Sequence, residues 1–104
     1  MLVVTTDTIP GREISQTLGL ARGNVIRAKH VGSDIIASLR NLVGGEISEY
    51  TQLMAAAREQ ALDRMIEDAR TQGADAIVGA RFTTATIAQG GAEILAFGTA
   101  VKLA

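Results

Sequence analysis

The chain has 104 residues, 47% of them hydrophobic, with ten basic and eleven acidic side chains that give a net charge of −1. This length fits a single small domain, residues 1–104. Because the chain has no cluster of basic residues, nucleic-acid binding is disfavoured, and the absence of cysteine excludes disulfides, thiolate metal sites and a cysteine nucleophile.

The apolar content comes mainly from alanine, isoleucine, valine and leucine. That is more small aliphatic surface than one modest core needs, so we expect part of it to be buried between subunits. The alternative is a tightly packed monomer with an ordinary apolar surface. No run approaches the roughly 18 apolar residues of a membrane helix. The N-terminal residues lack the basic region and apolar run of a secretory signal, so we expect a cytoplasmic protein without a membrane partner.

The first third of the chain favours strands. Residues 2–6 are rich in β-branched side chains, which predicts a short strand. Polar and apolar residues alternate over residues 12–20, which predicts a half-buried strand, and this strand is expected to continue over residues 24–31. Gly19 and Gly23 indicate a bulge or a bend. The residues expected on one face of the strand are Ile14, Gln16, Leu18 and Leu20.

The middle of the chain predicts two helices. Ser33 and Asp34 mark the start of a short one, since serine caps free N–H groups and aspartate favours the positive end of the helix dipole. This helix ends at Gly44. A long helix is predicted over residues 48–72, with Gly73 as its stop. Its broad apolar stripe comprises Tyr50, Leu53, Met54, Ala57, Ala61, Leu62, Met65, Ile66 and Ala69.

Two more strands are predicted over residues 75–87 and 93–103, with a hairpin turn over residues 88–92. The last strand is apolar or small on both faces, as expected for a central strand or for one that meets a neighbouring subunit. Strands at both ends of the chain flank a helical middle, so the predicted class is α+β. We expect a small, antiparallel-rich sheet packed on one long and one short helix.

Few residues are candidates for chemistry. His30 is the sole histidine, and zinc or copper sites gather several nitrogen or sulfur ligands. Copies of it could meet on a symmetry axis, but a surface or capping role is the favoured interpretation. The other candidates are scattered carboxylates, which could act in acid–base catalysis if two shared a cleft. Structural roles are favoured for this set: Asp7, Asp34, Glu46, Glu49, Asp75 and Glu93.

A glycine pair before the long helix offers a candidate ligand site. Such a loop can present N–H groups to an anion at a helix N-terminus, and two nearby arginines could assist. No phosphate-loop or dinucleotide glycine motif is present, so a helix–helix turn is the favoured alternative. The candidate ligand-binding residues are Arg40, Gly44, Gly45, Tyr50 and Arg58.

Several segments together resemble the YbjQ-like family of small, uncharacterised bacterial and archaeal proteins, over nearly the whole chain. Each segment alone is weak evidence, and together they are specific. They are Thr5–Thr6 with Ile9–Gly11, Arg40–Gly45 with Tyr50, Ala57–Glu59 with Ala61, Gly73–Gly79, and Gly98–Val101.

The resemblance implies a dodecin-subunit-like α+β fold that assembles into a ring-shaped homo-oligomer, with five subunits as the expected number. The family is also labelled heavy-metal-binding. One histidine and no cysteine give that label no direct support in this sequence.

Three functions remain open, and the sequence identifies no cofactor. The first is a non-enzymatic homo-oligomer that binds a small ligand or ion at subunit interfaces. The second is a metal-binding protein that uses carboxylates and His30, which would suit magnesium or manganese better than soft heavy metals. The third is an enzyme with an aspartate or glutamate as general base, which a cleft holding two carboxylates would favour.

Overall fold

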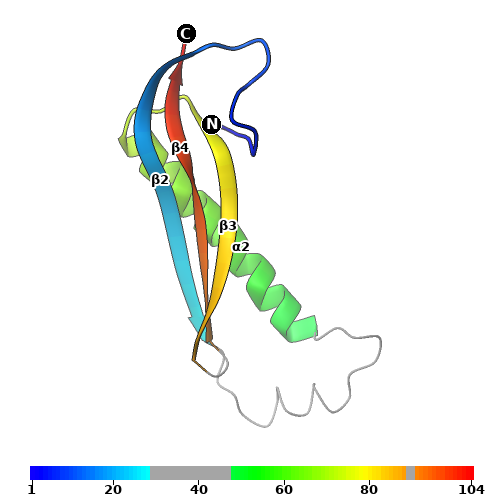
Figure 1. Ribbon diagram of the computed structural model, residues 1–104. Helices are drawn as coiled ribbons and strands as arrows, with labels where there is room; N and C mark the ends of the chain where they lie inside the picture. Colours follow the sequence, from blue (N-terminus) through cyan, green and yellow to red (C-terminus); the bar gives the residue numbers. More distant parts are fainter. Residues whose placement is uncertain (29–47, 89–90) are drawn as a thin grey trace.

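The computed structural model describes residues 1–28, 48–88 and 91–104. In chain order these form β1 (Leu2–Val3), β2 (Ile14–Ala28), α2 (Ser48–Thr71), β3 (Ala76–Ala88) and β4 (Gly91–Leu103). The strands make one sheet with the order β1-β3-β4-β2, in which β1 runs parallel to β3 and the other pairs are antiparallel. The long helix α2 packs on one face of this sheet (Figure 1). The predicted α+β class is confirmed, whereas the predicted short helix lies outside the described residues.

The long helix begins and ends within a residue of the prediction. It stops where expected because Gly73 has a φ of +82°, a left-handed conformation that glycine adopts at little cost. The Gly73 N–H donates to the Arg70 carbonyl at 3.0 Å, and the Ala74 N–H donates to the Ala69 carbonyl at 3.1 Å. These bonds occupy carbonyl groups that the end of a helix leaves free.

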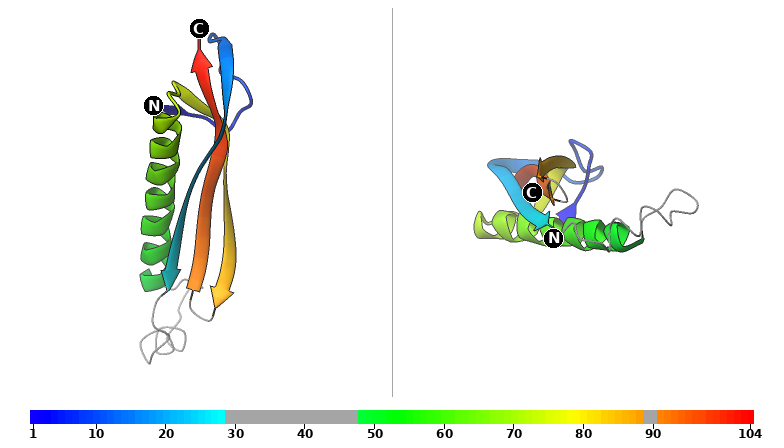
Figure 2. Two further views of the ribbon diagram at one scale, coloured as in Figure 1. Left: turned by 90° about the vertical axis from the view of Figure 1, so that its left-hand side faces the viewer. Right: turned by 90° about the horizontal axis from the view of Figure 1, so that it is seen from below.

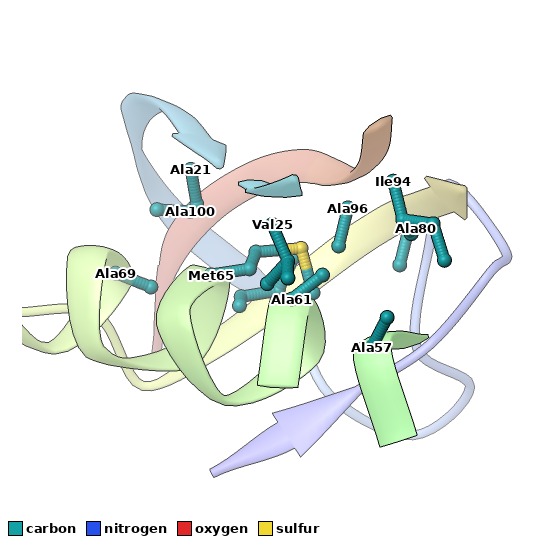
Figure 3. Close-up of a cluster of buried hydrophobic side chains, with 11 residues drawn as sticks. Ala21, Val25, Ala57, Ala61, Met65, Ala69, Ala80, Ile94, Ala96 and Ala100 are labelled. Atoms are coloured by element: carbon teal, nitrogen blue, oxygen red, sulfur yellow. The ribbon is translucent and has the colours of Figure 1, made fainter. Parts of the chain in front are cut away.

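The core between α2 and the sheet is built mostly from small side chains. Helix residues at spacing of four are buried: Ala57, Ala61, Met65 and Ala69. They pack against a set from β2 and β4: Ala21, Val25, Ile94, Ala96 and Ala100. Figure 3 shows these side chains gathered in one cluster between helix and strands. The alanine-rich composition therefore serves close approach of α2 to the sheet.

That approach is closest at Gly23 of β2. A Cβ atom added there would lie 2.3 Å from the Met65 backbone nitrogen and 2.5 Å from the Ala61 carbonyl oxygen. Real Cβ atoms do not come so near to backbone atoms, so only glycine fits. The prediction of a bulge or bend at Gly23 is wrong; the residue marks a helix–strand contact instead.

Register shifts near the start of β2 change which side chains face the helix. The pairing with β4 slips between Thr17 and Gly19, and it is regular beyond that point. A bulge at Gly19 is thus confirmed. After it the odd-numbered residues, such as Ala21, face α2, and Leu20 is 57% exposed. The expectation that Leu20 shares a face with Leu18 is therefore wrong, because a bulge reverses the side-chain alternation.

The N-terminal segment covers one end of the opposite sheet face. Its strand is shorter than the predicted residues 2–6, but the chain continues beside β3: the Val4 N–H donates to the Ile77 carbonyl at 2.9 Å. Ile9 packs with Ala76, Val78 and Val101 in a second buried cluster on that face. β4 lies inside the sheet, which is one of the two alternatives predicted for it. Near its C-terminal end both faces are covered, since Ala100 belongs to the core under α2 and Val101 to the second cluster.

Candidate functional site

Polar side chains of α2 reach over the edge of β2. They recur every fourth residue along the helix, at Gln60, Arg64 and Asp68, and the spacing continues to Gln72 directly after its last residue. The Gln72 side-chain amide donates to the Leu20 carbonyl at 2.9 Å. One step back along the helix, Asp68 Oδ2 accepts from the Arg22 backbone N–H at 3.0 Å. Both bonds use backbone groups of β2 that point away from the sheet.

The same pattern continues toward the start of the helix. Arg64 Nη1 donates to the Asn24 carbonyl at 2.7 Å. Gln60 differs, because its side chain accepts from Arg27 Nη2 and not from a backbone group of β2. Four residues of helix rise about 6 Å and two residues of strand about 6.7 Å, so each step on α2 meets the next outward-facing residue of β2. The helix thus occupies the free edge of β2 over residues 20–24.

A hollow of about 470 Å³ lies where this edge meets the sheet face turned away from α2. Its lining residues are Arg22, Asn24, Asp68, Glu93 and Leu95. The Asn24 side-chain amide donates to Glu93 Oε2 at 3.3 Å. The lining therefore combines an arginine, two acidic residues and an asparagine with one leucine, an arrangement that can hold a small polar molecule.

The hollow brings together two carboxylates, Asp68 and Glu93, as the enzyme hypothesis requires. Each already accepts a hydrogen bond, from the Arg22 backbone N–H and from Asn24 respectively. A carboxylate that accepts one hydrogen bond keeps further lone pairs free, so both groups can also bind a ligand.

The sheet face turned away from α2 carries large apolar side chains among the polar ones that line the hollow, and the described residues leave much of it uncovered. Paired strand residues share a face, which places Leu20, Ile26, Leu95 and Phe97 together on it. Leu20 and Ile26 are each 57% exposed. Figure 2 shows the helix on one side of the strands and the N-terminal segment at the end of the sheet where β2 begins and β4 ends. This outer face thus carries two of the large hydrophobic side chains that are exposed on the described surface, Leu20 and Ile26.

The ligand site predicted around the glycine pair is not tested. Arg40, Gly44 and Gly45 lie outside the described residues, and Tyr50 falls in the first turn of α2. Arg58, two turns further along, has an exposed side chain. The structure therefore describes one side chain of this group.

The predicted carboxylate set and His30 are only partly described. His30, Asp34 and Glu46 lie outside the described residues. Asp75 has the structural role that was expected, because its Oδ2 accepts from the Leu103 backbone N–H at 2.9 Å. Glu93 is the one member of the set that lines the hollow.

The described residues offer no metal centre and no membrane span. Within residues 1–28, 48–88 and 91–104, no three histidine or carboxylate side chains come close enough together to hold an ion. Over the same residues, no helix combines the length and apolarity that a bilayer crossing requires.

Sequence reasoning missed most of the hollow. Arg22, Asn24 and Asp68 carry no motif, and they meet Leu95 only because β2 pairs with β4 and α2 crosses β2. One signal was available, the polar residues that recur every fourth position along a helix whose other stripe is apolar.

Comparisons with known proteins agree with the sequence resemblance. The family model described as "Putative heavy-metal-binding" (YbjQ) matches residues 1–104. A UPF0145 protein of Methanosarcina acetivorans is 56% identical over 103 residues, which is 99% of this chain and 97% of that protein. A UPF0145 protein of Vibrio parahaemolyticus is 57% identical over 103 residues, covering 99% of this chain and 98% of the relative.

A solved structure supports the fold. A protein of unknown function from the DUF74 family of Pediococcus pentosaceus superposes with a TM-score of 0.70 and 14% identity, covering 100% of this chain and 98% of that one. At that identity the likeness shows the fold alone. The full-length family match and the close relatives decide the assignment: this chain belongs to the YbjQ family.

Proposed function

We propose that this protein is a non-enzymatic homo-oligomer that binds a small polar ligand at or beside a subunit interface. The observation that carries the proposal is the outer sheet face with its exposed Leu20 and Ile26. Several large apolar side chains exposed on one sheet face are typical of an interaction site on soluble proteins. The hollow lined by Arg22 and Glu93 opens on the same face, so a second copy would lie over or next to it.

The subunit number is an expectation from the family resemblance alone. Five copies form a closed ring when each uses two different patches and the rotation between neighbours closes. The outer face supplies one such patch. Cytoplasmic location also remains a prediction.

The first test is native mass spectrometry of untagged protein purified without added metal or chelator. We expect a closed oligomer under gentle conditions, with a discrete extra mass that is released on activation. An oligomer without extra mass would keep the assembly and reject tight binding of a ligand. A monomer at every concentration would overturn the proposal, because the outer face would then need no partner.

Metal binding is the second candidate, and the family description favours it. Soft heavy metals prefer thiolate and imidazole ligands; the chain has no cysteine and one histidine. The described residues therefore do not fit such an ion within one subunit. Equilibrium dialysis against magnesium, manganese, zinc and copper tests the alternative built on carboxylates and His30. Stoichiometric retention of one ion would support it, and retention of none would reject it.

The glycine-pair site is tested separately with inorganic phosphate as the anion. If Arg40 and Arg58 bind it, the double variant Arg40→Ala/Arg58→Ala should lose phosphate binding in calorimetry while the oligomer persists. The matched control, Arg12→Ala/Arg70→Ala, removes the same charge from exposed positions elsewhere. Equal binding by wild type and the Arg40/Arg58 variant would reject this site.

A further inference from the structure

The edge of β3 differs chemically from the edge of β2. Over residues 76–80 it is paired with the N-terminal segment, for example by the Ala80 N–H donating to the Val4 carbonyl at 3.0 Å. The side chain of Arg81 then donates to the Thr5 carbonyl at 2.7 Å. Beyond Arg81, no strand among the described residues pairs with this edge.

The register shows which backbone groups are left open there. Arg22 and Asn24 of β2 point their backbone N–H and C=O groups away from β4 and toward α2. Their partners in β4, Phe97 and Leu95, therefore point their own backbone groups toward β3. The residues opposite these in β3 are Thr83 and Arg81. It follows that the backbone N–H and C=O groups of the intervening residues face the open edge: Phe82, Thr84 and Thr86.

The open segment has the composition of a pairing strand. Residues 82–87 read Phe-Thr-Thr-Ala-Thr-Ile, without a charge, a proline or a glycine. Proteins protect unpaired edges with those residues or with a covering element. β2 is covered in this way by α2, and β3 is not covered by the described residues. Phe82 and Ile87, at the two ends of the segment, are 51% and 54% exposed.

We propose that the edge of β3 over residues 82–87 pairs with a strand of a second copy of this chain. This inference rests on the proposed homo-oligomer and names its contact. Strand pairing supplies direction through main-chain hydrogen bonds, while the adjoining outer face supplies the apolar area. Over residues 20–24 the backbone groups at the edge of β2 are already bonded by side chains from the helix. This part of β2 is therefore excluded as the strand of the second copy that pairs with β3.

The test is Thr84→Pro, with the oligomer measured by light scattering after size exclusion. Proline removes an outward N–H but leaves the bonds between β3 and β4, so a single subunit can still fold. We expect a dissociation constant raised about tenfold or more, with an unchanged circular dichroism spectrum. Thr84→Lys should act in the same direction, since a lysine on the edge opposes strand addition. The matched control, Thr84→Val, keeps the N–H and should assemble like wild type.

Each result has one meaning. Weaker assembly of the proline and lysine variants beside a normal valine variant supports the pairing. If the proline variant fails to fold, the lysine variant decides. Assembly of both at wild-type strength overturns the contact at β3 while leaving the homo-oligomer standing. A monomeric wild type overturns the proposed function itself.

Discussion

Gly23→Ala is expected to destabilise the protein by about 3 kcal/mol or more, at the upper end of what overpacking costs. The new methyl group would meet the backbone of α2 at Met65 and Ala61 rather than a flexible side chain. Backbone atoms cannot rotate away, so α2 must shift along its whole contact with β2. That shift would also lengthen the hydrogen bond that Arg64 donates to the strand and the one that Asp68 accepts from it.

Urea unfolding followed by circular dichroism measures the change at Gly23. Gly11→Ala is the matched control: its φ of +79° disfavours alanine, but no atom lies within 4 Å of the added Cβ. It therefore isolates the backbone cost, about 1 kcal/mol. Equal stability loss at the two glycines would show that α2 does not lie as close to β2 as the structure places it.

Met65→Ala is expected to cost about 2–5 kcal/mol of unfolding free energy. Met65 is 1% exposed and is among the largest fully buried side chains. Its neighbours are mostly alanines, which have no rotatable side chain to fill the cavity, so the loss should fall toward the larger figure.

The comparison for this variant is Met54→Ala, which removes the same atoms from a half-buried position near the start of the same helix. It should cost clearly less, because fewer of its contacts are lost. If the unfolding free energies of the two variants fall with urea at the same slope, the difference between their midpoints gives the difference in stability. A Met65 variant as stable as the Met54 variant would contradict the placement of the core beneath the middle of α2.

The long helix was predictable because its signals are local and mutually consistent. An apolar stripe at helical spacing and a terminal glycine fix its length without reference to the rest of the chain. The central position of β4 was one of two alternatives that the sequence left open, since small and apolar residues on both faces are expected for a covered strand or for one that meets a neighbouring subunit. The class followed from the order of these elements.

The face of β2 was predicted incorrectly beyond Gly19, since alternation in sequence does not reveal where a bulge reverses it. The role of Gly23 was hidden for a similar reason. A glycine in a strand signals either a bulge or a close approach, and the partner that distinguishes them, Met65, is 42 residues away in the chain. Predicting the hollow requires still more information, because β2, β4 and α2 must already be placed relative to one another.

The matched spacing of α2 and β2 restricts how this chain can change in length. One residue inserted between Gln60 and Gln72 would turn the rest of the helix by about 100°, so the polar side chains beyond it would lose their partners on the strand together. One residue inserted in β2 would reverse its faces. α2 and β2 can lengthen without losing these hydrogen bonds only if four residues are added to the helix together with two residues to the strand. The turns outside α2 and β2 are free of this constraint.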